Sequence, residues 1–150
     1  MMDPPKALLE RSFLQAVAQD DHADHSRAVD EYVRLVELYQ REELLLVAVS
    51  DHAQRFPGMH HPWRQIGLRR TGVFAPVDFL WVGFQHRRAA RRAADEHGLE
   101  FEMALTLTMA ERHRIVRLVT LDPRFDAFEL TILPQRDEST DDVTPAIAES

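Results

Sequence analysis

The chain has 150 residues, contains no cysteine and carries a formal net charge of −7. This length, together with 45% hydrophobic residues, suits one domain with its own core, and the missing cysteines exclude disulfides, thiolate catalysis and cysteine-ligated zinc. No apolar run approaches the roughly 18 residues that would span a bilayer. We therefore expect a cytoplasmic protein without a membrane partner.

The first half of the chain predicts two strands and two helices. Residues 6–11 form a short strand candidate, and Ser12 is the expected cap of the helix that follows. From Asp24 onward, apolar residues recur at helical spacing, which predicts a long amphipathic helix. Residues 44–49 form a continuous apolar run, which is typical of a strand that is covered on both faces.

The second half continues the alternation of strands and helices. A short helix capped by Ser50 is expected after the second strand, and a further strand is expected over residues 73–77. Asp78 is the expected cap of a helix that ends at Gly98. The remaining expected elements are a helix over residues 101–113 and strands over residues 116–121 and 128–133.

This order of elements predicts an α/β fold, a three-layer sandwich with a central, mainly parallel sheet flanked by helices. Ligands of such folds lie beyond the carboxyl ends of the strands, where both Glu10 and Asp122 are expected to fall. We expect the domain to cover residues 1–134. Residues 135–150 hold five acids and one arginine, so we expect an acidic, flexible tail there.

Two stretches carry a family resemblance. The stretch LERSFLQAVAQDDHADHSRAV, residues 9–29, places an acid and a serine at the end of the first strand, before a histidine-containing helix start. The stretch LTLTMAERHRIVRLVTLDPRF, residues 105–125, places a threonine two residues before an acid, and LTILP at residues 130–134 closes a strand with proline. Over roughly residues 6–134 the chain resembles PIN domains, the nuclease fold of the VapC-like toxins in bacterial toxin–antitoxin pairs.

The resemblance implies a cluster of about four carboxylates that holds one or two Mg2+ or Mn2+ ions and activates water against an RNA phosphodiester. Glu10 and Asp122 stand at the first and last acid positions, which makes them the expected metal ligands. With Asp126 as an auxiliary acid, they are also the expected catalytic residues. The two other acid positions of the family fall on Arg55 and Met103.

This incomplete acid set leaves two functions open. Two carboxylates about 5 Å apart repel by roughly 3 kcal/mol at an effective dielectric near 20, so we hypothesise that Arg55 replaces the metal and pairs with Glu10 or Asp122. We favour a PIN-like protein that binds RNA or protein without a cofactor. The alternative is an endoribonuclease that binds Mg2+ or Mn2+ weakly, uses Asp51 to extend its acid set and has an antitoxin as its partner.

A second candidate site is the basic stretch QHRRAARRAADEHG at residues 85–98. On a helix its arginines fall within an arc of about 140°, opposite the alanines. This face could bind RNA phosphates, a partner protein, a second copy of the chain in a homodimer, or the acidic tail, although a solvated helix face is a simpler interpretation. Aromatic residues that could stack on bases are not interleaved in the stretch. The arginines are Arg87, Arg88, Arg91 and Arg92.

Overall fold

The computed structural model describes residues 3–53, 69–72 and 77–135. Within these residues five parallel strands form one sheet in the order β3-β2-β1-β4-β5. Because β1 is the central strand, its carboxyl end lies between those of β2 and β4. The strands are β1 (Lys6–Leu9), β2 (Leu45–Val49), β3 (Val77–Leu80), β4 (Arg117–Val119) and β5 (Thr131–Leu133).

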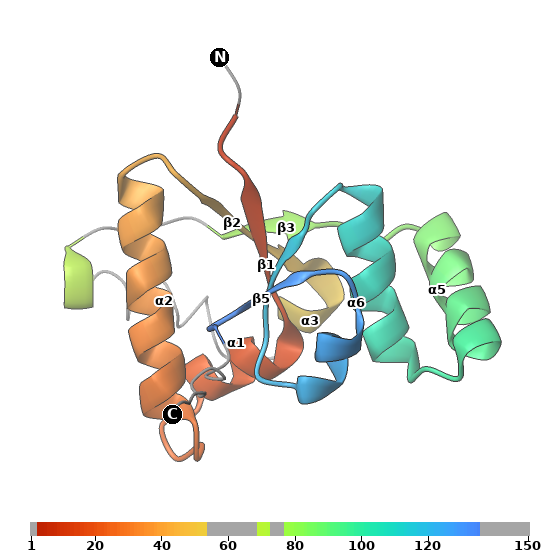
Figure 1. The fold of residues 1–150 in the computed structure, drawn as a ribbon, viewed down its shortest axis with the longest axis horizontal. Coiled ribbons are helices and arrows are strands. Elements are labelled where there is room, and N and C mark those ends of the chain that lie inside the picture. Colours follow the sequence, from red (N-terminus) through yellow and green to blue (C-terminus); the bar gives the residue numbers. More distant parts are fainter. Residues whose placement is uncertain (1–2, 54–68, 73–76, 136–150) are drawn as a thin grey trace, which may run out of the picture.

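Helices cover both faces of this sheet. Figure 1 shows α2 on one side of the strands and α6 on the other, with α5 lying outside α6. The predicted three-layer α/β sandwich is therefore confirmed. None of the described helices is long and apolar enough to cross a membrane. The helices are α1 (Arg11–Ala18), α2 (His25–Gln40), α3 (Ser50–Ala53), α5 (Phe84–His97), α6 (Phe101–Arg112) and the 3-10 helix η1 (Pro123–Ala127).

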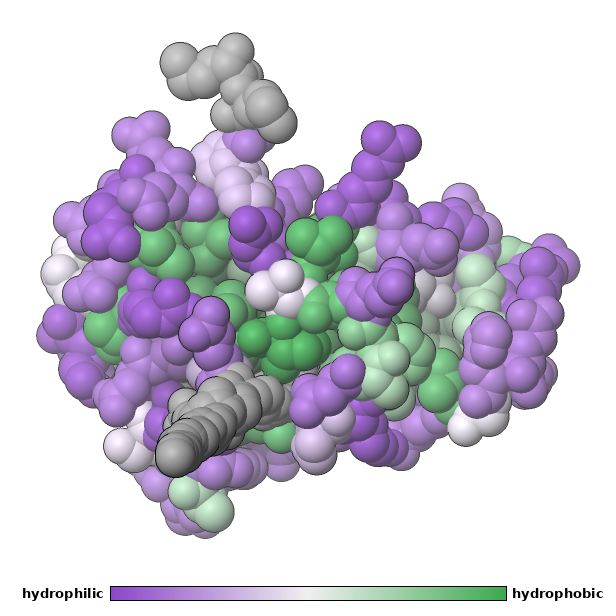
Figure 2. Space-filling model, viewed as in Figure 1, coloured by the Kyte–Doolittle hydropathy of each residue, from purple (hydrophilic) through white to green (hydrophobic). Residues whose placement is uncertain are grey.

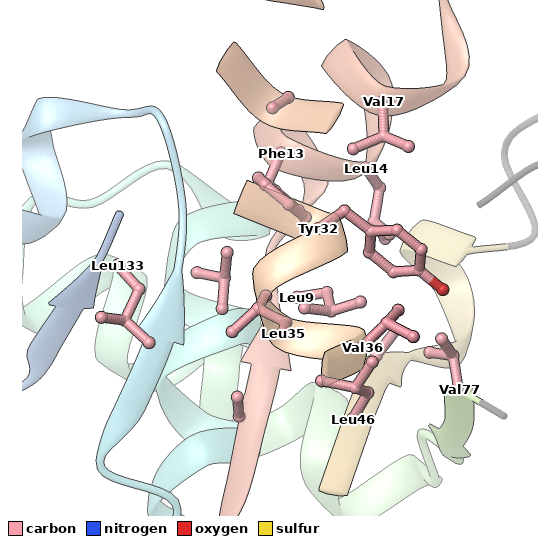
Figure 3. Packing of buried hydrophobic residues seen from close by; sticks show 14 of the residues in the cluster. Leu9, Phe13, Leu14, Val17, Tyr32, Leu35, Val36, Leu46, Val77 and Leu133 are labelled. Atoms are coloured by element: carbon pink, nitrogen blue, oxygen red, sulfur yellow. The ribbon is translucent and has the colours of Figure 1, made fainter. Parts of the chain in front are cut away.

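The strands divide their side chains between two cores, because successive residues of a strand point to opposite faces. Leu9 packs with Phe13 of α1 and Tyr32 of α2, and Figure 3 shows these side chains gathered on one face of the sheet. Leu8 packs on the opposite face, against a cluster that includes Met109 of α6. Each fully buried large side chain contributes about 1.5–3 kcal/mol, so both helical layers are held by apolar contact with the sheet.

Several elements form as their sequence patterns predict. The helix expected from Asp24 is α2, and the apolar run at residues 44–49 gives β2. The helix expected over residues 101–113 is α6, which ends one residue earlier. Gly98 follows α5 with φ of 64°, a left-handed conformation that glycine adopts without the steric cost of a Cβ atom.

Two local predictions are wrong. Ser12 lies inside α1, whose cap is Glu10, because a longer carboxylate one residue before the helix reaches the Ser12 N–H. Asp78 lies within β3, and the cap of α5 is Gly83. Of the strand expected over residues 73–77, Val77 lies in β3, and residues 73–76 lie outside the described residues.

Candidate functional site

The carboxylate of Glu10 lies where β1 ends and α1 begins, and it is held by groups from both α1 and the end of β4. Its Oε1 accepts hydrogen bonds from the Ser12 N–H at 3.0 Å, from Ser12 Oγ at 2.5 Å and from Thr120 Oγ1 at 2.6 Å. The Ser12 hydroxyl in turn accepts a hydrogen bond from the Leu121 N–H, and the Thr120 hydroxyl accepts one from the Asp122 N–H, each at 3.0 Å. Glu10, only 5% exposed, is thus a buried acceptor that joins two neighbouring strand ends.

Asp122 follows Thr120 by two residues at the same edge of the sheet, and its carboxylate binds an arginine. The Arg124 side chain donates to both carboxylate oxygens, with Nη2 2.7 Å from Oδ2 and Nε 3.1 Å from Oδ1. The Arg124 N–H also donates to Oδ1 at 3.0 Å, which makes Asp122 the cap of η1. These bonds from Arg124 lower the pKa of Asp122 below its ordinary value, because they stabilise the charged form.

Removing the arginine tests this pair. In Arg124→Gln, the pKa of Asp122 is expected to rise toward 3.8, because the guanidinium that favours the carboxylate is gone. A lowered pKa stabilises the folded state above the ordinary pKa, and this contribution is lost as pH falls through the folded value. The pKa is measured by NMR titration of the Asp122 carboxyl carbon. Arg112→Gln, which changes an exposed arginine of α6, should leave that titration unchanged.

The helix after β2 contributes a second pair of polar contacts to the same edge of the sheet. Arg87 of α5 reaches Asp51, with Nη1 2.8 Å from Oδ2. His52 is 1% exposed, and its Nε2 lies 2.7 Å from Oε1 of Glu102 at the start of α6. The α3 helix therefore connects β2 to both α5 and α6 through polar side chains.

His52 is a residue of the candidate site that the sequence patterns did not predict. Burial lowers its pKa below 6.5, while the hydrogen bond and charge of Glu102 act in the opposite direction. The neutral imidazole donates from Nε2 to Glu102, and Nδ1 is buried without a hydrogen-bond partner among the described residues. The available signal was a histidine three residues after a buried strand, in a helix that starts with serine.

The positions expected to complete an acid cluster do not do so in the described residues. Met103 is 6% exposed and packs in the core beneath α6, and Asp126 is an exposed residue of η1. Arg55, and with it the hypothesised arginine pair, lies outside the described residues.

Mg2+ or Mn2+ requires several oxygen ligands around one point. Over residues 3–53, 69–72 and 77–135, no group of three or more His, Asp or Glu side chains could hold a metal ion. Oε1 of Glu10 already accepts three hydrogen bonds, and both oxygens of Asp122 are held by Arg124. The described donor set therefore does not fit a divalent metal site.

The arginine face of α5 borders a groove of about 450 Å3. Phe84, the first residue of α5, is 74% exposed, and the guanidinium of Arg88 lies 5.7 Å from its ring centroid. Arg91 lies over Phe101 at 5.3 Å. The aromatic partner that the stretch itself lacked is therefore supplied by the residue just before it. We call Phe84 and the four arginines the arginine strip; its basic members are Arg87, Arg88, Arg91 and Arg92.

Comparison with known proteins supports the fold. No family model matches the sequence, and no curated protein matches it. A similar solved structure is that of VapC20 from Mycobacterium tuberculosis, which is described as a sarcin–ricin loop cleaving toxin. The two chains are 16% identical, the match covers 81% of this chain and 93% of VapC20, and the TM-score is 0.53. The chain therefore has a PIN-like α/β fold, the fold of a VapC toxin.

Proposed function

We propose that this protein is a PIN-like RNA-binding protein that does not cleave its RNA. The observation that carries the proposal is the pairing of acids at the carboxyl edge of the sheet. Asp51 is paired with Arg87, Asp122 with Arg124 and Glu102 with His52. Each of these carboxylates has a cationic or hydrogen-bonding partner from the chain itself.

This pairing competes directly with metal chemistry. A divalent ion must displace the Arg124 guanidinium before it can bind Asp122, and it must displace hydroxyl donors before it can bind Oε1 of Glu10. Displacement at Glu10 leaves the buried Thr120 hydroxyl without its acceptor, which costs about 1–3 kcal/mol. Arg124 is exposed, so water can replace the carboxylate as its partner and the ion competes there only with a surface ion pair. A metal-dependent nuclease instead needs carboxylates that are held ready for the ion.

RNA binding is supported by the arginine strip. Arginine recognises phosphate oxygens through several N–H donors in a fixed plane, and an exposed aromatic ring offers a surface on which a base can stack. Arg88 and Phe84 are in contact, so one site offers both interactions. Hydrophilic side chains cover the outer end of the molecule, where α5 lies, at the right of Figure 2. All four arginines of the strip are exposed, so a strand of RNA can reach them.

The proposal predicts how RNA affinity depends on the strip. The triple variant Arg88→Ala, Arg91→Ala, Arg92→Ala should bind a single-stranded RNA dodecamer at least about tenfold more weakly, in fluorescence anisotropy. The slope of log affinity against log salt should fall by about 2, since each lost phosphate contact removes about 0.7 for a single strand. The matched control changes three exposed arginines elsewhere, namely Arg27, Arg41 and Arg69, and should lose less than about twofold. Equal losses in both variants would contradict the proposal.

The alternative function is a metal-dependent endoribonuclease with an antitoxin partner. One observation favours it: Glu10 and Asp122 lie at neighbouring strand ends and are connected through Thr120. Calorimetric titration with Mn2+, beside an RNA-cleavage assay, separates the two functions. We expect no binding tighter than about millimolar and no metal-dependent cleavage, because the described acids already have partners. Micromolar Mn2+ binding that Asp122→Asn abolishes would establish the nuclease instead.

A further inference from the structure

Two large aromatic side chains are exposed between the end of β3 and the start of α5. Trp81 is 65% exposed, and Phe84, three residues further on, is 74% exposed. In the described part of the chain, the third exposed large hydrophobic side chain is Val116, which directly precedes β4. A single exposed apolar side chain is ordinary on a protein surface, whereas neighbouring ones mark a place where something binds.

The backbone that carries Trp81 is fixed at the carboxyl edge of the sheet. Leu80, the residue before it, is buried at the end of β3. The N–H of Val82, the residue after it, donates a hydrogen bond to Oγ of Ser50 at 3.3 Å, just beyond the end of β2. The rings of Phe79 and Trp81 meet edge to face, with their centroids 5.6 Å apart. Trp81 is therefore held in place although most of its surface lies in water, so a ligand has little side-chain freedom to remove.

The aromatic pair lies beside the arginine strip. The Cα atoms of Trp81 and Phe84 are at most about 11 Å apart, because only three residue steps separate them. Phe84 contacts Arg88, and the groove that it lines contains the four arginines against two acids, Asp95 and Glu96. The core of a protein interface is depleted in charged side chains, whereas a binding site for single-stranded RNA combines aromatic rings with cations. The surroundings of the pair therefore favour RNA over a protein partner.

We infer that Trp81 and Phe84 stack on two unpaired bases of the RNA whose phosphates the arginine strip binds. The inference rests on the proposed function and adds the class of RNA that this site selects. In an RNA duplex the bases are stacked on one another, so only a single strand or a loop offers base faces to an aromatic ring. Every base has such a face, so the pair selects for unpaired RNA and not for a particular sequence.

The selection is tested with one unstructured RNA dodecamer, used alone and annealed to its complement. The variant Trp81→Ala, Phe84→Ala should bind the single strand at least about fivefold more weakly and the duplex less than about twofold more weakly. Its salt slope should stay that of the parent, because no phosphate contact is removed. Val116→Ala is the matched control and should change neither affinity. Equal effects on single strand and duplex, or no effect on either, overturn the inference alone, whereas no RNA binding by the parent overturns the proposed function and the inference with it.

A second measurement separates stacking from a structural effect of the tryptophan. Trp81→Phe keeps an aromatic face and should retain most of the affinity for the single strand, whereas Trp81→Leu keeps only apolar surface and should lose affinity as Trp81→Ala does. The chain has two tryptophans, so Trp63→Phe leaves Trp81 as the one fluorophore of its kind. Its emission should be quenched by the single strand and not by the duplex. A shift of this emission when the chain alone is concentrated assigns the aromatic pair to a contact between two copies and overturns the inference.

Discussion

Glu10→Ala is expected to lower the free energy of unfolding by about 2–4 kcal/mol, because α1 loses its cap and the buried Thr120 hydroxyl loses its acceptor. The Ser12 N–H loses its acceptor at the start of α1, and the hydroxyls of Ser12 and Thr120 lose the carboxylate that they share. A chemical denaturation curve at pH 7 measures the change. The loss arises even if the protein has no ligand, because the carboxylate is a structural acceptor.

Two variants sharpen this test. Glu10→Gln keeps one oxygen as an acceptor and should lose clearly less stability than Glu10→Ala. Thr120→Val removes one of the three donors, and its effect should be smaller in the Glu10→Ala background, since the two residues share one hydrogen bond. A nuclease acid cluster behaves in the opposite way, because removing one repelling carboxylate stabilises such a site. A gain in stability for Glu10→Ala would therefore contradict the structural role.

Glu102→Ala is expected to cost about 1–3 kcal/mol at pH 7, the penalty for leaving a buried donor without an acceptor. The imidazole of His52 is buried, and the carboxylate of Glu102 is the acceptor of its Nε2–H. Glu111→Ala is the matched control, because Glu111 is an exposed glutamate on the same helix. Equal stability of the two variants would show that the bond to His52 contributes nothing.

The same pair predicts a dependence on pH. Since burial lowers the pKa of His52 in the folded state, the unfolded chain binds more protons below pH 6.5. Stability therefore falls as pH drops from 6.5 toward the folded pKa, by up to about 1.4 kcal/mol per pH unit. Glu102→Gln removes the negative charge that raises the pKa of His52, so this pKa should be lower in the variant. The stability of the variant should therefore keep falling to a lower pH than the stability of the parent. Denaturation curves at intervals between pH 7 and 5 measure both slopes.

The sequence patterns predicted the layers of the fold but not the residues at which every helix and strand begins and ends. The pattern from Asp24 and the run at residues 44–49 are long and regular, so α2 and β2 form where the hydrophobic period places them. β5 has only three residues, and the expected strand over residues 128–133 began too early. So short a strand is defined by its pairing with β4, which no local pattern encodes.

The candidate site was harder to predict for the same reason. Glu10 and Asp122 were identified because a strand end in a parallel sheet is a recognisable position. Their partners were not, since Arg124 could have pointed to solvent and His52 contacts Glu102 across 50 residues of sequence. Side-chain pairing of this kind depends on how helices pack on the sheet. Periodicity determines which face of a helix is buried, but it does not determine which polar groups meet at the helix ends.

The hydrogen bond between Thr120 and Glu10 spans 110 residues, and it has a consequence for synthesis on the ribosome. β1 is made before the other strands of the sheet, whereas its neighbour β4 is the fourth strand in chain order. A nascent chain therefore holds the Glu10 carboxylate in water until Thr120 has left the exit tunnel, because long-range contacts form only after the intervening loop is closed. The hydrogen-bond network of Glu10 is completed only after β4 has been made, and a chain truncated before β4 cannot assemble it.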